Sequence, residues 1–404
     1  MTLSNQRFRL KDLYSFSGYK YCDSLIENNN ILIVLKRTGK TGKCPCCGKR
    51  CRSIHQRRKR RIRDLDIVGS KSIISFDFFD IACPCGYEGV EELEFVEPYC
   101  RYTKRFEEKV IFLCQIMCIK DVSKEMRIGW ETVKNIDKRN AMKYIVDFEN
   151  VNPTKIGVDE IAYEKGHKYL TVVRDIDLGK VIWVGKGRKK EDLDVFFKKL
   201  GITKSWNITV AVCDMWDAYI SSIKGNTKAA IVFDKFHIAK VVNEAIDKIR
   251  KKEFAKADKE ERKLMKKKRF LILSRQKNLK SEKTEELNQL LDQNNTLYTA
   301  YVLKEQVLDI FEDGDGAVGK RRLNIWVKNV FRTGIDQLQD IAKRICNYMY
   351  GIYNYFDYKL TNAQSEGINT KINIIKRRAF GFRDLEYFKL KILQICGLCN
   401  QNIP

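Results

Sequence analysis

The sequence has few prolines and no long apolar segment. Only 5 of its 404 residues are proline, and no Pro-rich linker divides the chain. No apolar run approaches the roughly 20 residues that a membrane-spanning helix needs. The opening residues, MTLSNQRFRLKDLYSF, also lack the apolar core of a signal peptide. We therefore expect an intracellular protein of the cytoplasm with no membrane partner.

Acidic residues are scarce, and one stretch has none. The chain has 77 Lys and Arg against 52 Asp and Glu, a net charge of +25, while 44% hydrophobic residues suffice for large cores. Thirteen Lys or Arg and no acid lie between Lys36 and Arg63, including QRRKRRIR. Such a surface suits a polyanion, with nucleic acid favoured over a membrane surface. We expect this run to contact DNA, in particular through Arg57, Arg58, Arg60 and Arg61.

Twelve of the fourteen cysteines fall into two groups. In a large intracellular chain, cysteines are more often metal ligands or core thiols than disulfides. CPCCG offers Cys44 and Cys47 in the C-x-x-C spacing of a zinc knuckle, and CPCG offers Cys83 and Cys85. The second pair is one residue closer than usual, so Cys46, Cys51 or His55 could replace one ligand. The other cysteines lie among apolar residues and are expected to pack in cores: Cys114, Cys118, Cys213, Cys346, Cys396 and Cys399.

Helical periodicity follows the cysteine-rich segment. Apolar residues at helical spacing run from Lys104, and Gly129 interrupts the pattern before it resumes. This pattern predicts a helix-turn-helix whose second helix spans about 131–142. Helical hairpins also serve as plain scaffolds, but the outer side of this one is basic. We expect contacts with DNA from Lys134, Lys138 and Arg139.

Beyond residue 152 the pattern predicts a mixed α/β domain. Strand-like runs at KIGVDEIAY, KYLTVVRDI and KVIWVGK precede a helix and two further strands, NITVAVCD and AAIVFD. Three successive strands followed by alternating helix and strand indicate a mixed sheet covered by helices. Residues 235 to 350 are then almost wholly helical in pattern and strongly basic.

Carboxylates in apolar strands are the candidates for catalysis. Asp159 lies within IGVDEIAY and Asp214 ends ITVAVCD, where a charge is costly unless it is paired, hydrogen-bonded or bound to a metal. Glu366 lies in TNAQSEGINTKINIIKRRAFGF, and it is the single acid among four basic residues there. It could merely favour a helix N-terminus, with Thr361 and Gln364 as a capping box. Alternatively, the three acids could converge on two divalent ions about 3.5–4 Å apart, with Mg²⁺ the natural choice and Mn²⁺ possible.

Four ordered blocks resemble those of a known family. GVDEIAYEKGHKYLTVVRDID, VCDMWDAY, IVFDKFHIAKVVNEAID and TNAQSEGINTKINIIKRRAFGFRD are similar to blocks of bacterial insertion-sequence transposases of the DDE type, in the ISL-three family. The resemblance covers nearly the whole chain. It implies a ribonuclease H-like α/β catalytic domain with a large all-α insertion, preceded by a small zinc-binding unit and a helix-turn-helix domain.

The resemblance also implies roles for single residues. Asp159, Asp214 and Glu366 match the DDE triad that holds the metal ions. Asp234 and His237 match a D-x-F-H block, for which a structural or DNA-positioning role is favoured, although His237 could contact a phosphate or a metal. Trp216, Asp217 and Tyr219 follow the second acid, where packing is the favoured role of the aromatic residues. Possible accessory positions on the last helix are Asn362, Asn369 and Arg377.

These expectations define the domains. They are a zinc-binding DNA-binding unit (1–98), a helix-turn-helix domain (99–150), a catalytic domain (151–234 and 355–404) and a helical insertion (235–354).

The expected function is that of a nucleoid-associated transposase. It would bind double-stranded DNA at terminal inverted repeats, as a homodimer or larger oligomer, and catalyse Mg²⁺-dependent strand cleavage and strand transfer. The alternatives are a DNA-binding regulator derived from a transposase, with no catalytic activity, and a ribonuclease H-like nuclease without strand transfer.

Overall fold

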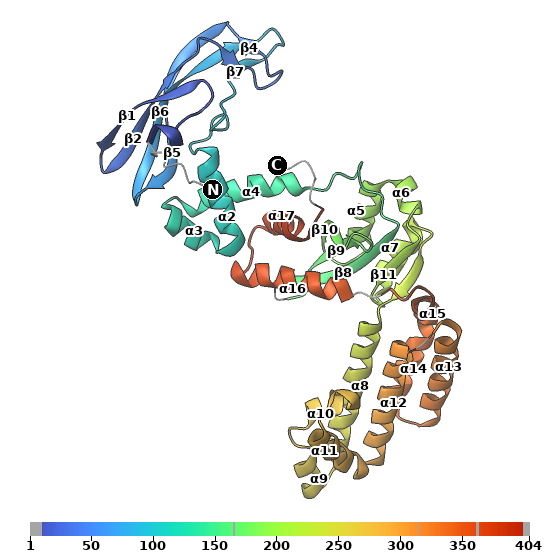
Figure 1. Ribbon diagram of the computed structural model, residues 1–404. Helices are drawn as coiled ribbons and strands as arrows, with labels where there is room; N and C mark the ends of the chain where they lie inside the picture. The colour runs from blue at the N-terminus through green and yellow to red at the C-terminus, as the bar shows by residue number, and fades with distance from the viewer. Residues whose placement is uncertain (1–9, 165, 314, 361–362, 399–404) are drawn as a thin grey trace, which may run out of the picture. The chain divides into compact units, whose positions relative to one another are not determined.

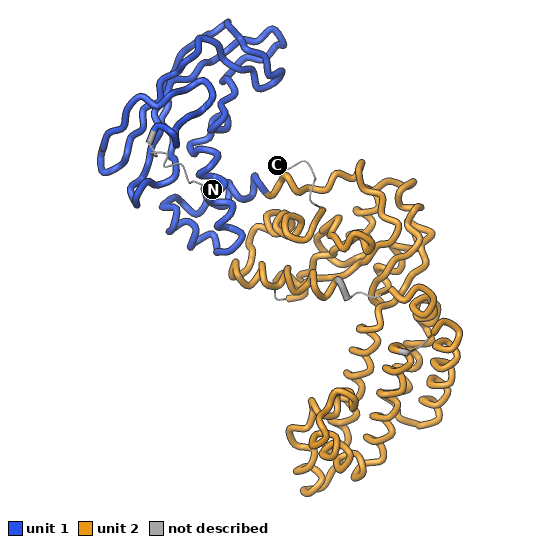
Figure 2. Tube along the Cα trace, viewed as in Figure 1, with its two compact units in different colours: residues 1–140 blue, residues 141–404 orange. Residues whose placement is uncertain are grey.

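The computed structural model describes residues 10–164, 166–313, 315–360 and 363–398. The chain divides into two compact units, residues 1–140 and 141–404 (Figure 2). Among the described residues, no helix is both long and apolar enough to cross a membrane.

The first unit begins with a twisted β-sheet. After the short helix α1 (Leu10–Leu13), the sheet is formed by β1 (Tyr19–Glu27), β2 (Asn30–Arg37), β5 (Ile54–Ile67), β6 (Ser70–Ala82) and β7 (Glu88–Val90). The strand order is β1-β2-β6-β5, and β7 pairs with β6. Alternate apolar residues of β6, among them Ile74, Phe76 and Phe78, lie in a core that the sequence pattern of period two predicts.

A small knuckle lies within the sheet region. It is formed by β3 (Gly42–Lys43) and β4 (Arg50–Cys51), which pair with each other in antiparallel orientation. Gly48 has φ +73° in the turn between them, and its N–H donates to the carbonyl oxygen of Cys44. The knuckle therefore brings Cys44 and Cys47 to one turn, as the spacing predicts.

Three helices complete the first unit: α2 (Lys104–Ile116), α3 (Ile119–Met126) and α4 (Trp130–Ala141). Thr103 caps α2 by accepting a hydrogen bond from the N–H of Phe106. Val122, Met126, Val133 and Ile136 share one core with α2, so the apolar faces inferred from the sequence are those that pack. The helix predicted near 131–142 is α4.

The second unit contains a five-stranded mixed sheet (Figure 1). Its strands are β8 (Lys155–Glu164), β9 (Lys168–Asp175), β10 (Lys180–Lys186), β11 (Val210–Cys213) and β12 (Ala230–Phe233). They lie in the order β10-β9-β8-β11-β12. The pairs β10/β9 and β9/β8 are antiparallel, whereas β8/β11 and β11/β12 are parallel. The C-terminal ends of β11 and β12 therefore lie at the same edge.

Each face of this sheet is covered by helices. One face packs against α5 (Lys190–Leu200) and α7 (Asp217–Asn226), with the short α6 (Ile202–Trp206) between them. The other face packs against α16 (Ala363–Arg378) and α17 (Leu385–Cys396). Ile368, Ile372 and Ile375 of α16 contact this second face, as the apolar stripe in the sequence predicts.

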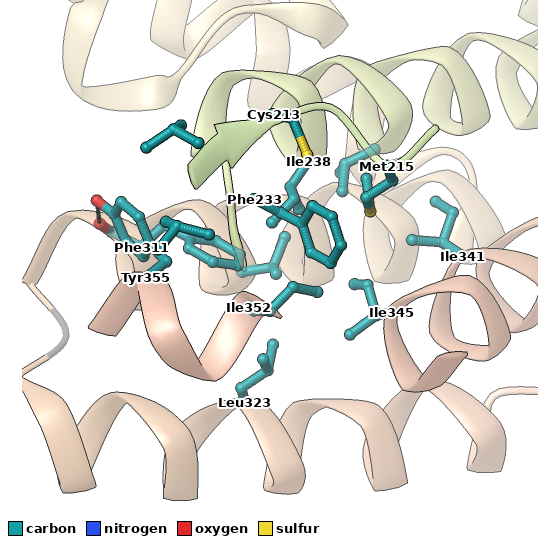
Figure 3. Packing of buried hydrophobic residues seen from close by; sticks show 14 of the residues in the cluster. Cys213, Met215, Phe233, Ile238, Phe311, Leu323, Ile341, Ile345, Ile352 and Tyr355 are labelled. Atoms are coloured by element: carbon teal, nitrogen blue, oxygen red, sulfur yellow. Dashed lines mark hydrogen bonds between the residues drawn. The ribbon is translucent and has the colours of Figure 1, made fainter. Parts of the chain in front are cut away.

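Residues 235–358 are helical throughout most of their length. The helices are α8 (Lys235–Lys256), α9 (Lys259–Met265), α10 (Arg269–Leu273), α11 (Ser281–Asp292), α12 (Asn295–Asp313), α13 (Gly316–Arg332), α14 (Asp336–Asn347) and α15 (Met349–Tyr358). Their apolar faces share one core with the sheet, and Figure 3 shows Phe233 of β12 among residues of these helices. Gly351 permits the close approach of α15, because a Cβ there would lie 2.4 Å from the Phe233 ring.

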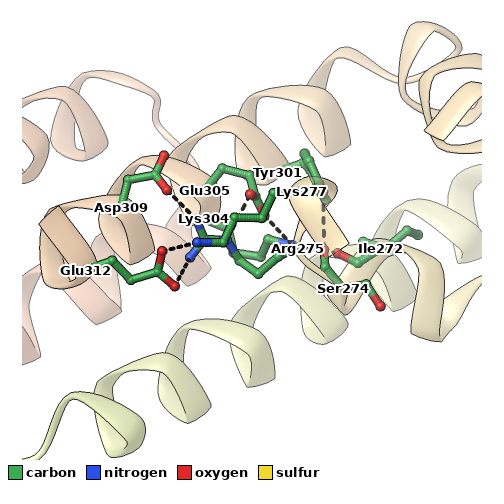
Figure 4. A network of polar contacts seen from close by, with 9 residues as sticks. All are labelled: Ile272, Ser274, Arg275, Lys277, Tyr301, Lys304, Glu305, Asp309 and Glu312. Carbon is green, nitrogen blue, oxygen red and sulfur yellow. Dashed lines mark hydrogen bonds and ion pairs between the residues drawn. The ribbon is translucent and has the colours of Figure 1, made fainter. Parts of the chain in front are cut away.

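A buried polar network holds the helices of this segment together (Figure 4). Lys304 is fully buried, donates to the carbonyl oxygens of Ile272 and Ser274, and lies 3.0 Å from Glu305. Arg275 pairs with three acids on α12, namely Glu305, Asp309 and Glu312. Desolvation lowers the pKa of Lys304 to about 8. The segment is therefore joined by charged as well as apolar contacts.

Three of the five scattered cysteines that the structure describes pack as expected, whereas Cys118 is only half-buried and its Sγ donates to Oδ2 of Asp121. Cys114, Cys213 and Cys396 are buried in cores. The expectation is wrong for Cys346, which is exposed on α14 because the apolar side of that helix is formed by other residues. Cys399 lies outside the described residues.

Candidate functional site

Three carboxylates distant in sequence line one cavity in the second unit. Asp159, Asp214 and Glu366 border a cavity of about 900 Å³, together with Asp234, His237 and Asn369. Asp159 lies in β8, Asp214 directly follows the neighbouring strand β11, and Glu366 lies in α16. The cavity continues along α8 past Lys240, Asn243, Lys248 and Lys251 to Arg269.

Asp159 is oriented by two hydrogen bonds. Its Oδ1 accepts from the backbone N–H of Glu160, and its Oδ2 accepts from Nδ2 of Asn369, both at 2.7 Å. The side chains of Asp159 and Ile161 project from the same face of β8, and Ile161 packs in the core that includes α16. Desolvation, followed by the charge of Asp214, raises the pKa of Asp159 to about 6.

Asp214 follows β11 and meets the start of α8. Nε2 of His237 lies 2.7 Å from Oδ1 of Asp214. Asp234 caps α8 by accepting a hydrogen bond from the N–H of Phe236, which fixes the first turn that carries His237. Desolvation lowers the pKa of His237. The hydrogen bond to Asp214 and the charges of the surrounding acids raise it by more, so the net shift is upward. The D-x-F-H block thus positions a histidine against the second acid.

Glu366 lies in the first turn of α16 and is exposed toward the cavity. Asn369 follows it by three residues, on the same side of the helix, and contacts Asp159. The proposed capping residue Thr361, and also Asn362, lie outside the described residues, as does the side chain of Gln364. Arg377 is exposed near the far end of α16 and does not line the cavity. Of the accessory residues expected on α16, Asn369 alone is placed by the described structure at the acids.

This arrangement suits a divalent cation. Desolvation raises the pKa of Asp159, and repulsion by the nearby carboxylate of Asp214 raises it further. A hard cation that prefers oxygen ligands, such as Mg²⁺, would relieve this repulsion. The donor set of two aspartates and one glutamate therefore fits the expected metal.

One neighbour of the acids has no signal in the sequence pattern. Arg174 of β9 is 2% exposed; desolvation lowers its pKa, while the charges of Asp159 and Asp234 raise it. It lies directly across from Gly157 of β8, where a Cβ would be 2.6 Å from Nε of Arg174. The pairing of β9 with β8, which the sequence does not specify, is what places this buried arginine near the acids.

The aromatic residues after Asp214 differ in their surroundings. Tyr219 is buried, and its hydroxyl lies 2.8 Å from Oγ1 of Thr171, so the packing role holds for it. Trp216 is 40% exposed, although its Nε1–H donates to the carbonyl oxygen of Arg188. The Arg188 guanidinium lies 4.8 Å from the Trp216 ring and pairs with Glu160. Trp216 is therefore only partly packed.

Four cysteines meet in the first unit. The Sγ atoms of Cys44, Cys47, Cys83 and Cys85 lie within 4.8 Å of one another, with Cys44 to Cys85 at 3.7 Å and Cys47 to Cys83 at 3.5 Å. Thiolates about 2.3 Å from one tetrahedral zinc ion would lie about 3.8 Å apart. Although desolvation raises it, backbone hydrogen bonds from Cys47 and Cys46 bring the pKa of Cys44 down to about 7. The four thiols that converge are the two pairs that the sequence spacing predicts, without Cys46, Cys51 or His55.

The predicted DNA-contacting arginines have acidic or carbonyl partners. On β5, Arg57 pairs with Asp77, Arg58 with Asp80 and Arg61 with Glu27. Arg60 donates to the carbonyl oxygen of Cys100.

On α4, Arg139 pairs with Glu107 of α2, while Lys134 and Lys138 are partly exposed. The basic run is therefore partly neutralised within the unit, while Arg57, Arg58 and Arg61 remain more than half exposed.

Comparison with known families gives three consecutive matches. Residues 156–392 match a family described as transposase, residues 91–139 match the helix-turn-helix domain of transposase family ISL3, and residues 40–77 match the zinc-finger of transposases IS204, IS1001, IS1096 and IS1165. The chain belongs to the ISL3 transposase family. This confirms the resemblance drawn from the four sequence blocks. The zinc-finger match includes Cys44 and Cys47 but ends before Cys83, so the second pair of thiols is evident from the structure.

Curated relatives agree with this assignment. The transposase for insertion sequence element IS1001 of Bordetella parapertussis is 34% identical over 365 residues, 89% of this chain and 90% of the relative. The transposase for insertion sequence element IS1557 of Mycobacterium tuberculosis is 28% identical over 395 residues, 90% of this chain and 88% of the relative. As a member of this family with zinc-finger, helix-turn-helix and transposase regions, the chain is a DNA-binding enzyme that cleaves and transfers DNA strands.

Proposed function

We propose that this ISL3 transposase binds the terminal inverted repeats of an insertion sequence and cuts and joins DNA with Asp159, Asp214 and Glu366 as ligands of two Mg²⁺ ions. One observation carries the proposal: these carboxylates, up to 207 residues apart (366 − 159), line a single cavity. A role for Glu366 in the helix dipole alone would not require its helix to pack beside the two aspartates.

We propose a ribonuclease H-like fold for the catalytic domain. The support is the sheet, in which three antiparallel strands (β10, β9, β8) continue into two parallel strands (β11, β12), with helices on both faces. The proposed catalytic segments are 151–234 and 355–404, with 235–354 as the insertion. In the first unit, 1–98 would be the zinc-binding part and 99–150 the helix-turn-helix.

The residues of this chain would orient the acids and the DNA. Asn369 holds one oxygen of Asp159, which leaves the carboxylate in a fixed rotamer, and His237 does the same for Asp214. Bound metal ions would activate water or a 3′ hydroxyl as nucleophile and stabilise the charge at phosphorus. Exposed Lys240 and Lys248, which continue along the same cavity, are placed to attract the phosphate backbone.

The first unit would hold the DNA ends. We propose that the four cysteines bind a structural zinc ion, since a small sheet gains stability from a metal that its thiolates share. DNA contacts would come from the exposed arginines of β5, Arg57, Arg58 and Arg61, and from the basic side of α4. Two ends must be brought together for strand transfer, so a homodimer or larger assembly on DNA is proposed.

The test is Glu366→Gln, which keeps the size of the side chain and removes its charge. We expect cleavage of the element's own end DNA in Mg²⁺ to fall on the order of 100-fold or more, because loss of a metal ligand removes several kcal/mol of transition-state stabilisation. Electrophoretic mobility should show DNA binding within about 3-fold of the parent. Mn²⁺ binding, followed by electron paramagnetic resonance, should weaken in the same variant.

Glu386→Gln is a matched control. Glu386 also lies in the first turn of a helix, α17, but it is exposed and pairs with Lys389. This variant should cut at the parental rate. If Glu366→Gln also cuts at that rate, the triad assignment is wrong. A parent protein that binds the ends but never cuts them would instead support the DNA-binding regulator.

A further inference from the structure

One loop of the second unit presents a phenylalanine to solvent in a strained conformation. The loop AFGFRD, residues 379–384, joins α16 to α17, and Phe380 within it is 91% exposed. Its φ is +54°, in the left-handed region. Phenylalanine is poorly suited to this position, because its Cβ is unfavourable in the left-handed region and its apolar ring is exposed to water.

The strain follows from the way α16 ends. The N–H of Phe380 donates to the carbonyl oxygen of Arg377, and the N–H of Gly381 donates to that of Lys376. Such a helix end places one residue in the left-handed region, where glycine or asparagine is usual because a Cβ is unfavourable. The glycine of this loop, Gly381 with φ +95°, lies one position later, so Phe380 occupies the position where glycine is usual. The fold itself therefore gains nothing from a phenylalanine at 380.

The loop is fixed by its neighbours. Phe382, two residues later, stacks on Phe388 of α17 at 4.6 Å between ring centroids. Asp384 caps α17 by accepting a hydrogen bond from the N–H of Tyr387 at 3.0 Å. With α16 ending on one side and α17 beginning on the other, Phe380 is held out by a loop of defined shape. Little conformational entropy would be lost when its ring meets a partner.

The sequence that leads to Phe380 is strongly basic, and the first acids after it are Asp384 and Glu386. From residue 367 to 383 there is no acid, and five cations occur: Lys371, Lys376, Arg377, Arg378 and Arg383. Arg377 and Arg383 are exposed on either side of the phenylalanine. A second copy of this loop would be repelled, whereas a polyanion with flat apolar rings would satisfy both the charge and the aromatic side chain. Nucleic acid has this combination of features.

We propose that Phe380 stacks against a DNA base that is displaced from its pair, while Arg377 and Arg383 hold the neighbouring phosphates. This inference rests on the proposed function of the site, since Glu366 lies at the other end of the same helix. Glu366 and Arg378 are twelve positions apart, which corresponds to about 18 Å at 1.5 Å per residue. At about 3.4 Å per nucleotide, the displaced base lies about five nucleotides from the cut phosphate.

The experiment uses full-length protein and end duplexes with 2-aminopurine at single positions on each side of the cleavage site, without divalent metal. Stacking and unpairing change 2-aminopurine fluorescence, so this readout does not require cleavage. We expect a change of 2-fold or more confined to one or two positions about five nucleotides from the cut. Phe380→Ala should abolish it with less than 5-fold weaker binding, and Phe380→Trp should retain it.

Two controls separate stacking from a role in folding. Phe380→Gly should melt at the same or a higher temperature than the parent, since it relieves the left-handed strain, yet lose the fluorescence change. Trp206→Ala removes another exposed aromatic residue, on α6, and should leave the change intact.

Two results would overturn the proposal: no position responding with the parent protein, or Phe380→Ala responding like the parent. A third would be loss of self-association in Phe380→Ala with the fluorescence change preserved, which would assign the loop to contact between copies. A parent that shows the fluorescence change but does not cut in Mg²⁺ would refute the proposed catalysis and leave the stacking proposal standing.

Discussion

Gly157→Ala tests whether Arg174 is a fixed, buried cation beside the proposed catalytic acids. The added methyl group would lie 2.6 Å from Nε and 3.0 Å from Cζ of Arg174. Ordinary contacts between such atoms are about 3.5–4.0 Å, so the guanidinium must move by about 1 Å. Arg174 is 2% exposed and has little room for this.

The expected cost is that of overpacking, about 1–3 kcal/mol. For a unit of this size each kcal/mol corresponds to roughly 2–4 °C in Tm. The sign of the stability change is informative, because replacing glycine by alanine within a strand is otherwise stabilising. Movement of Arg174 would also weaken its attraction to Asp159 and Asp234, so strand cleavage should fall more than DNA binding.

Thermal unfolding followed by circular dichroism would measure the change. Gly225→Ala is the matched control, because Gly225 lies in α7 without a positive φ, and a Cβ added there would have no atom within 4 Å. That variant should be more stable by about 0.5–1 kcal/mol. Adding Arg174→Met to Gly157→Ala should give less destabilisation than the sum of the single changes. A Gly157→Ala protein that melts and cuts like the parent would refute the reasoning.

Two further predictions concern the zinc site and the buried lysine. Cys44→Ala/Cys47→Ala should lose about one zinc per chain by elemental analysis, and the sheet of the first unit should unfold at a lower temperature. Cys22→Ala, which changes an exposed thiol, should retain the metal. Equal zinc contents in the two variants would contradict the site. The pKa of Lys304 is lowered to about 8 in the folded chain from an ordinary 10.5, so the unfolded chain binds more protons above pH 8 and stability should rise with pH there. Relative to Lys304→Met, the parent should gain roughly 2 kcal/mol between pH 7.5 and 9.5 in urea unfolding, and parallel pH profiles would disprove the assignment.

The elements could be predicted from the sequence where a local pattern determines them. The apolar stripe of α16, the helices on either side of Gly129 and the knuckle at Cys44 each follow from spacing within one segment. The candidate acids Asp159 and Asp214 were also identifiable, because a charge in an apolar strand has few structural explanations.

Partners from distant segments could not be predicted in this way. The acid-free run from 36 to 63 suggests an uncompensated positive surface, yet Asp77 and Asp80 on the neighbouring strand pair with Arg57 and Arg58. Only the register of β5 on β6 brings them together. In the same way, the hydrogen bond from Asn369 to Asp159 spans 210 residues and depends on how α16 packs on the sheet.

The position of Glu366 determines when the proposed set of three acids is complete during synthesis. The first 140 residues form a unit with its own cores, whereas the cavity gains its third acid only when α16 packs on the sheet. A nascent or prematurely terminated chain would therefore carry the DNA-binding unit before, or without, a complete set of acids. With the roles proposed above for the first unit and for Glu366, such fragments would occupy DNA ends without cutting them, and incomplete translation would restrain the activity of the element.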